Sequence, residues 1–158
     1  MTLISLITVT YNRAHTIKGA IEGVLRQRNK NYEYIIVDGA SKDNTLEILK
    51  EYEPKFEGRM RWVSEPDKGL YDAINKGLKM AIGDVVGIIN SADFFHRDDV
   101  FDLVTQAFND KQTDAIYGDE RVVDETGKPI YYDSSKYFRT WMYRIGLMPG
   151  HESFYAKK

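Results

Sequence analysis

Short apolar runs alternate with segments of helical periodicity along most of the chain, and this alternation constrains the fold more than any other feature. Four runs rich in branched residues are expected to be strands: residues 3–9, 34–37, 61–64 and 85–89. After each run, apolar residues recur at three- and four-residue intervals, as on one face of a helix. Strands that are apolar throughout must be covered on both faces. The sequence therefore predicts an α/β, Rossmann-like fold with a mostly parallel sheet and helices on both faces.

The alternation changes after residues 115–117, which begin a fifth predicted strand. Residues 121–124 and 129–132 flank a turn that contains Gly127, and this pattern predicts an antiparallel hairpin. The remaining residues, 134–158, are rich in aromatic side chains and have no clear period. A length of 158 residues and the absence of a linker favour a single domain over residues 1–158.

Composition excludes several classes of function. The 22 Lys and Arg residues against 24 Asp and Glu give a net charge of −2, so we expect no nucleic-acid partner. The chain has no cysteine, which excludes thiolate nucleophiles and favours a cytoplasmic location. No apolar run approaches the roughly 20 residues that span a bilayer, so membrane contact is expected to be peripheral at most. Neither a dinucleotide fingerprint nor a P-loop is present.

Polar residues gather in the four turns that follow the predicted strands. They are Thr10, Tyr11, Asn12 and Arg13; Asp38, Gly39, Ser41 and Asp43; Glu65, Asp67, Lys68 and Gly69; and Asn90, Ser91 and Asp93. The carboxyl ends of parallel strands share one edge, where open α/β sheets bind ligands. Any one cluster taken alone is more typical of residues that only cap helices and form turns. Asp38 ends an apolar run and would be buried, so we interpret it either as a ligand of a nucleotide base or ribose or as a structural residue.

The fourth turn is the candidate metal site. The oxygen atoms of Asn90, Ser91 and Asp93 suit Mg²⁺ or Mn²⁺ bridging to a diphosphate. Asp98 and Asp99 precede a predicted helix and are interpreted as its N-terminal cap. Lys68 or Lys76 would supply a cation for phosphate, and Asp43 is expected only to cap the second helix.

Four segments carry a family resemblance: ITVTYNR, IIVDGASKDNT, SEPDKGLYDAINKGLKMAIGDVVGIINSAD and YGD. They resemble the successive motifs of family 2 glycosyltransferases with the GT-A fold, most closely the bacterial subgroup that builds O-antigen and other surface polysaccharides. The resemblance implies an inverting transfer of a sugar from a nucleotide donor, with UDP-sugar expected, to a glycan or lipid-linked acceptor at the inner face of the membrane. Residues 1–119 would form the donor part, and residues 120–158 would begin the acceptor part of a longer chain.

The resemblance also implies roles for individual residues. The donor-binding residues would be Thr10, Tyr11, Arg13, Asp38, Asp67, Lys68, Asp72, Asn75 and Ser91. Asp93 would hold the metal. Ala92 departs from the commonest form of the family's motif, which has an aspartate there, so Asp93 would be the sole carboxylate that this loop offers the ion.

An inverting transfer needs a carboxylate that takes the proton of the attacking hydroxyl. The final segment, MPGHESFYAKK, resembles the family's acceptor-side motif, and Glu152 is its only acid. Asp119 is the rival candidate, and a packing role for His151 and Glu152 is equally open. Two other functions stay open: a sugar-nucleotide pyrophosphorylase, although its glycine-rich basic phosphate loop is missing, and a catalytically silent nucleotide-sugar-binding module.

Overall fold

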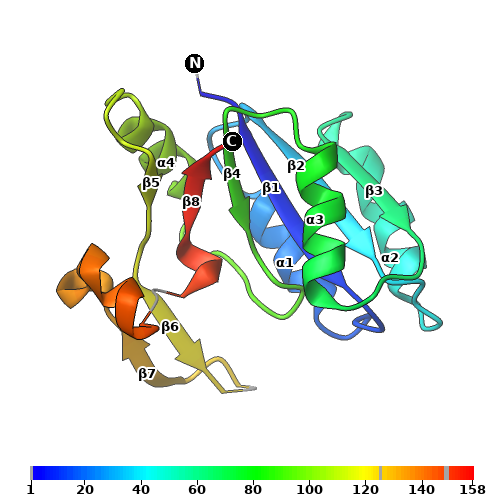
Figure 1. Cartoon of the computed structure of the whole chain (residues 1–158). Helices are drawn as coiled ribbons and strands as arrows, with labels where there is room; N and C mark the ends of the chain where they lie inside the picture. The colour runs from blue at the N-terminus through cyan, green and yellow to red at the C-terminus, as the bar shows by residue number, and fades with distance from the viewer. Residues whose placement is uncertain (1, 125, 148–149) are drawn as a thin grey trace.

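The computed structural model describes residues 2–124, 126–147 and 150–158, and it alternates strands and helices as far as β5 (Figure 1). The elements in chain order are β1 (Ile4–Thr10), α1 (Ile17–Leu25), β2 (Tyr32–Asp38), α2 (Thr45–Tyr52), η1 (Glu53–Phe56), β3 (Met60–Ser64), α3 (Leu70–Met80), β4 (Val85–Ile88), α4 (Val100–Phe108), β5 (Ala115–Ile116), β6 (Glu120–Val123), β7 (Pro129–Asp133), η2 (Ser135–Tyr137), η3 (Thr140–Ile145), η4 (His151–Ser153) and β8 (Tyr155–Lys157). The strands predicted from the apolar runs are therefore confirmed. Residues 125, 148 and 149, which belong to the predicted hairpin turn and to the final segment, lie outside the described residues.

The main sheet has the strand order β3-β2-β1-β4-β8-β5, and its first four strands are parallel. Alternate residues of β1 point to opposite faces, as the pleat requires. Ile4 and Leu6 pack in one cluster with apolar residues of α1, α2 and α4, whereas Ile7 and Val9 pack in a second cluster with residues of α3. Helix α3 lies on one face and α1 and α2 lie behind the sheet (Figure 1), so the predicted helices on both faces are confirmed.

The last strand, β8, was not expected from the sequence. It runs antiparallel between β4 and β5, with Gly87 paired to Tyr155 and Ile116 also paired to Tyr155. A Cβ atom at Gly87 would lie 2.2 Å from the Tyr155 ring, so the missing side chain of Gly87 makes room for this tyrosine. The predicted fifth strand is therefore separated from β4 by β8, and the sheet is mixed at this side. A three-residue strand has no period that a sequence pattern could reveal.

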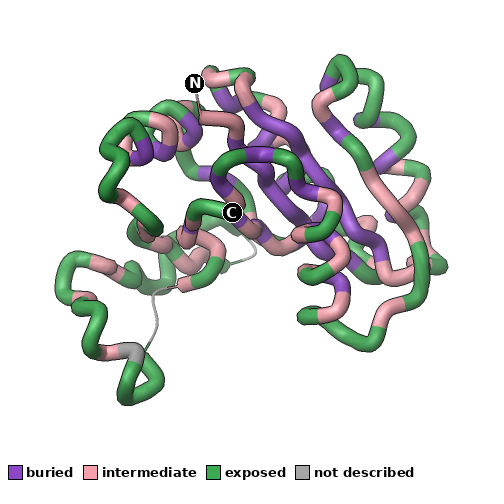
Figure 2. The backbone as a smooth tube through the Cα atoms, turned by 45° about the horizontal axis from the view of Figure 1, so that its top comes forward, coloured by how far each residue is buried: buried purple, intermediate pink, exposed green. Residues whose placement is uncertain are grey.

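The predicted antiparallel hairpin is confirmed as β6 and β7, which form a separate two-stranded sheet. No described residue from Glu120 to Leu147 is buried. Figure 2 shows the contrast between this exposed part and the buried strands of the main sheet.

The start of α4 differs from the expected cap. Asp98 pairs with Arg26 and Asp99 pairs with Arg97, and neither carboxylate caps the helix. The buried side chain of Gln27 does so instead. Its Oε1 accepts the backbone N–H of Phe101 at 3.2 Å, and its Nε2 donates to the backbone carbonyl of Arg97 at 2.7 Å. Gln27 thereby attaches α1 to the end of the loop that follows β4.

Glu33 is a buried carboxylate near the amino ends of the strands. It accepts hydrogen bonds from the Ser5 hydroxyl, the Ile82 backbone N–H and the Arg61 guanidinium. Burial acts to raise the pKa of Glu33, but these donors outweigh it and hold the pKa below the usual value of 4.5. The unfolded chain therefore takes up this proton more readily than the folded chain does.

This depressed pKa predicts acid sensitivity. The stabilisation from Glu33 is fully present above the unfolded pKa and is lost as the pH falls through the folded pKa. We expect Glu33→Gln to lower the free energy of unfolding at neutral pH by about 1–3 kcal/mol, because buried donors lose a charged acceptor. We also expect this variant to lose less stability than the parent between about pH 5 and pH 3. Urea unfolding across that range, with exposed Glu47→Gln as the control, checks this; equal pH slopes in Glu33→Gln and the parent would contradict it.

Candidate functional site

The carboxyl ends of β1, β2 and β3 end in register at one edge of the sheet. Thr10 pairs with Asp38, and Asp38 pairs with Ser64. The loops after these strands and after β4 therefore meet at this edge, and both ends of the chain lie at the opposite edge (Figure 1). The expectation that the four polar turns share one edge is met by the geometry of the described residues.

Asp38 forms the floor of this edge. Its side chain is fully buried, and it accepts hydrogen bonds from the Ser41 backbone N–H at 2.9 Å, the Ser41 hydroxyl and the Ser64 hydroxyl at 2.6 Å. Both carboxylate oxygens thus already have donors, from the second loop and from the end of β3. These contacts give Asp38 a structural role, and its contact with a nucleotide base stays a prediction.

The first two loops are joined by hydrogen bonds. Asn12 has a left-handed backbone conformation (φ 52°); its N–H donates to the Ser41 hydroxyl at 2.7 Å, and its side-chain oxygen accepts the Lys42 N–H at 2.8 Å. Asp43 accepts the Thr45 N–H at 3.0 Å, as its expected capping role requires, but it also accepts the Ala14 N–H at 3.0 Å. Asp43 therefore fixes the first loop as well as the start of α2. The side chains of Tyr11 and Arg13 are left exposed at this edge.

The third loop approaches the first two at Gly39. A Cβ atom there would lie 2.7 Å from Asp67 Oδ2, so any other residue would require the Asp67 carboxylate to shift, and it would lie 3.4 Å from the Tyr11 ring, which is ordinary contact. Asp67 also accepts the Gly69 N–H at 2.8 Å. Tyr11 and Asp67, which are 56 positions apart, therefore border the same space.

The cationic candidates of the third loop differ from each other. The Lys76 ammonium group donates to the Pro66 carbonyl at 2.8 Å and pairs with Glu65 at 2.9 Å. Lys76 thus fixes the loop after β3. Of the two lysines expected to bind phosphate, Lys68 is the one whose side chain is exposed. The Lys68 backbone N–H donates to Asp72 at 3.0 Å, and Asn75 is exposed on the next turn of α3.

The fourth loop brings Asp93 and Glu152 together. The Asn90 side-chain N–H donates to Glu152 Oε1 at 2.7 Å and lies 3.1 Å from His151 Nε2, which is itself 3.0 Å from Glu152 Oε1. Burial raises the pKa of Asp93, and the nearby charge of Glu152 raises it further, whereas a hydrogen bond with Asn90 opposes this rise. Ser91, in the same loop, is buried. We call Asn90, Asp93, His151 and Glu152 the acidic cluster.

The antiparallel direction of β8 explains this meeting. Because Tyr155 begins β8 opposite Gly87, near the carboxyl end of β4, the residues just before β8 lie beside the loop that follows β4. Glu152 thereby reaches a loop from which it is separated by about 60 positions in the sequence.

The adjacent acids Asp119 and Glu120 have different surroundings. Asp119 accepts hydrogen bonds from the Tyr132 hydroxyl and from the Ser135 N–H at 2.8 Å, and these contacts lower its pKa. It therefore secures the hairpin to η2 and is no member of the acidic cluster. Glu120 was not expected from the sequence; burial raises its pKa, and the charge of Glu152 adds to this. Successive residues of an extended chain point to opposite sides, so the sequence could not indicate which acid faces Glu152.

The donor atoms suit a hard cation but do not complete its coordination. Among residues 2–124, 126–147 and 150–158, no three His, Cys, Asp or Glu side chains are arranged as a metal site. Asp93 nevertheless offers carboxylate oxygens beside a second negative charge, an arrangement whose repulsion a cation would relieve. Mg²⁺ is often held by one or two carboxylates together with phosphate oxygens of the substrate. The residues present fit that mode of binding.

Comparison with known proteins decides the family. The family model for glycosyl transferase family 2 matches residues 5–156, almost the whole chain. The chain belongs to glycosyl transferase family 2. An uncharacterized glycosyltransferase of Mycobacterium tuberculosis is 36% identical over 109 residues, which are 68% of this chain and 40% of that protein. A PGL/p-HBAD biosynthesis glycosyltransferase of Mycobacterium bovis is 29% identical over 74% of this chain and 46% of its own length.

Solved structures confirm the GT-A fold of this chain. TarS 1–349 of S. aureus superposes with a TM-score of 0.76 and 20% identity over 98% of this chain and 47% of the TarS chain. A mannosyltransferase from Pyrobaculum calidifontis, solved with GDP-Man and Mn²⁺, gives a TM-score of 0.68 and 22% identity over 74% of this chain and 35% of its own. The chain therefore spans less than half the length of each of these four proteins.

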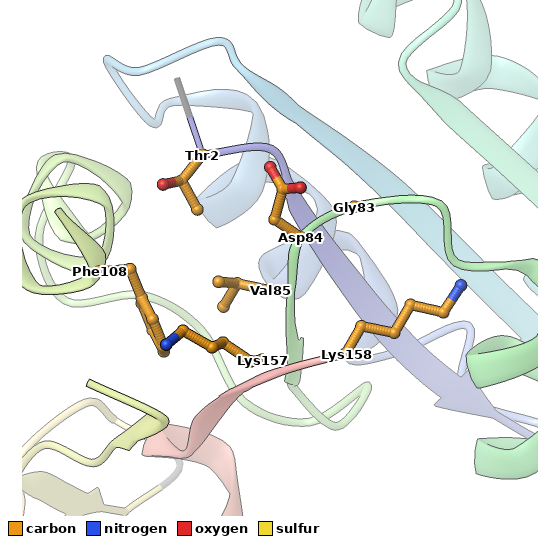
Figure 3. A pocket seen from close by; sticks show the side chains of 7 residues that line it. All are labelled: Thr2, Gly83, Asp84, Val85, Phe108, Lys157 and Lys158. Carbon is orange, nitrogen blue, oxygen red and sulfur yellow. The ribbon is translucent and has the colours of Figure 1, made fainter. Parts of the chain in front are cut away.

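A hollow of about 650 Å³ lies away from the acidic cluster, at the edge that holds both ends of the chain (Figure 3). Its lining includes Asp84, Phe108 and Lys157, and none of the predicted site residues. The Lys157 ammonium group is already held by the Lys111 carbonyl at 2.8 Å and by Asp114 at 3.3 Å. The hollow is therefore separate from the edge at which the polar turns meet. No described helix is long and apolar enough to cross a membrane.

Proposed function

We propose that this glycosyltransferase moves a sugar, with inversion, from a UDP-sugar to a glycan or lipid-linked acceptor in cell-surface polysaccharide biosynthesis. The observation that carries the proposal is the acidic cluster, in which Asp93 and Glu152 lie together at the edge where four loops converge. A TarS structure in complex with UDP-GlcNAc, with a TM-score of 0.71, supports a nucleotide-sugar donor, and the relative named for PGL/p-HBAD biosynthesis supports a glycoconjugate product.

The donor would lie across the first three loops. In this proposal Thr10, Tyr11, Arg13 and Asp38 surround the nucleoside. The diphosphate and the sugar would be bordered by Asp67, Lys68, Asp72, Asn75 and Ser91. The approach of Tyr11 and Asp67 over Gly39 supports this arrangement, because it joins the proposed nucleoside and sugar regions into one space.

Asp93 would hold Mg²⁺ or Mn²⁺ beside the diphosphate. When bound, the ion neutralises negative charge that develops on the leaving nucleoside diphosphate. The role of the chain is to present the Asp93 carboxylate at a fixed position. A hydrogen bond from the Asp93 backbone N–H to the Asn90 carbonyl, at 3.1 Å, supports such positioning.

Glu152 would be the general base. The acceptor oxygen forms its bond to the anomeric carbon while the bond from that carbon to the diphosphate oxygen breaks, and the hydroxyl proton passes to Glu152. The Asn90 amide and the His151 ring orient the Glu152 carboxylate. The His151 side chain is exposed and the Glu152 side chain is partly exposed, which supports access for an acceptor. We further propose a cytoplasmic location at the inner face of the membrane, which the cysteine-free composition supports.

Titration with UDP-sugars, with and without Mn²⁺, tests the proposal. We expect donor binding to be at least ~10-fold tighter with Mn²⁺, because the ion bridges the protein and the diphosphate. We also expect slow release of free UDP, measured by chromatography. Metal-dependent binding without any UDP release would favour the silent binding module. Formation of UDP-sugar from UTP and a sugar 1-phosphate would instead indicate a pyrophosphorylase.

A further inference from the structure

Residues 134–147, which follow the hairpin, expose large apolar side chains. Tyr137 is 72% exposed, Trp141 57%, Ile145 63% and Leu147 54%. Single exposed apolar residues are ordinary, but large ones gathered in one short segment indicate a surface that contacts a partner. The lower part of Figure 1 shows this segment beside the hairpin, at the same end of the molecule as the loops after β1 to β4.

The same segment is basic. It contains Lys136, Arg139 and Arg144 and no Asp or Glu, although the whole chain has a net charge of −2. Two acids flank it, because Asp133 directly precedes the segment in the sequence and Asp119 accepts the Ser135 N–H. The segment thus combines exposed aromatic and aliphatic groups with three basic side chains and no acidic one.

The backbone brings these two kinds of side chain onto one ridge. Residues Thr140–Ile145 form the 3-10 helix η3, in which side chains three positions apart are eclipsed. Regular 3-10 geometry would place Trp141 and Arg144, three positions apart, on one side of this helix. A tryptophan beside an arginine matches the interface of a bilayer, where indole rings lie at the headgroup level and arginine pairs with anionic lipid phosphate.

We propose that this aromatic–basic surface, formed by Lys136, Tyr137, Arg139, Trp141, Arg144 and Ile145, docks on an anionic lipid bilayer. The charge of the segment selects the bilayer over a neutral partner, because juxtamembrane Lys and Arg side chains are attracted to anionic headgroups. Docking on this surface would hold the loop edge of the sheet close to the membrane. This inference rests on the membrane location proposed above, and its test needs no turnover.

The two tryptophans of the chain allow a direct test. Trp62→Phe leaves Trp141 as the sole tryptophan, and circular dichroism verifies that the variant folds. We expect the emission of Trp141 to shift to the blue with vesicles of phosphatidylglycerol, together with co-sedimentation of the protein, and to stay unchanged with phosphatidylcholine vesicles. Binding should weaken as salt is raised, because exposed charges are screened.

Charge reversal provides the matched comparison. Arg144→Glu should weaken vesicle binding at least ~10-fold, because it replaces an attracted charge by a repelled one. Lys50→Glu makes the same charge change on exposed α2 and should leave binding unchanged. Equal loss in both variants, or no blue shift with anionic vesicles, would overturn the proposal. A blue shift that follows protein concentration without vesicles, with dimers in sedimentation, would assign the surface to self-association and overturn it as well.

Discussion

Replacement of Asp93 by alanine should abolish the metal-dependent part of donor binding and slow sugar transfer by about 10³-fold. The loss follows because the ion supplies several kcal/mol of charge stabilisation to the leaving diphosphate, and each 1.36 kcal/mol corresponds to a factor of ten. Binding of UDP-sugar by calorimetry, with and without Mn²⁺, and UDP release measure the two effects. We expect the two titrations to become equal in the variant.

The fold should survive this substitution. Burial and the neighbouring charge of Glu152 raise the pKa of Asp93, so its ionised form is disfavoured in the folded chain. Removal of the carboxylate relieves that cost, and we expect an unchanged or slightly higher melting temperature. Asp102→Ala, on the exposed side of α4, is the matched control and should keep the Mn²⁺ dependence. Unchanged Mn²⁺-dependent binding in Asp93→Ala would remove Asp93 from the site.

Glu152→Gln should lower the rate constant of transfer by about 10²–10⁴-fold, which is the usual contribution of a positioned general base. The amide keeps the size of the side chain and an oxygen that can accept the Asn90 N–H, so the local geometry should persist. We expect the affinity for the donor to change less than about 3-fold, because in the proposed mechanism Glu152 acts on the acceptor hydroxyl and not on the donor. Separate measurement of donor binding and of transfer distinguishes these effects.

Asp119→Asn tests the rival base. Asp119 already accepts hydrogen bonds from Tyr132 and Ser135, which lower its pKa and make it a poor proton acceptor. We expect this variant to keep the transfer rate within a few-fold of the parent. If Asp119→Asn loses transfer while Glu152→Gln retains it, the assignment of the base is wrong.

The order of strands and helices could be predicted because it is a local property. Each apolar run from β1 to β4 carries its own period or branched residues, and parallel strands necessarily end at a shared edge. This reasoning located Thr10, Asp38, Asp67 and Asp93 at that edge. The prediction that Asp98 and Asp99 cap α4 was wrong. The cap is Gln27, which is 74 positions from Phe101 in the sequence, and no local pattern indicates such a contact.

The sequence by itself therefore determined the fold class and the edge at which the family's motifs gather. Only the tertiary structure decided which acid meets Asp93. The short strand β8 carries no periodic signal, and its place between β4 and β5 depends on the packing of the Tyr155 ring over Gly87. That insertion brings Glu152 to the loop after β4, whereas Asp119 contacts η2 beside the hairpin. The sequence could not predict this difference, because a three-residue strand is positioned by non-local contacts, which sequence periodicity does not encode.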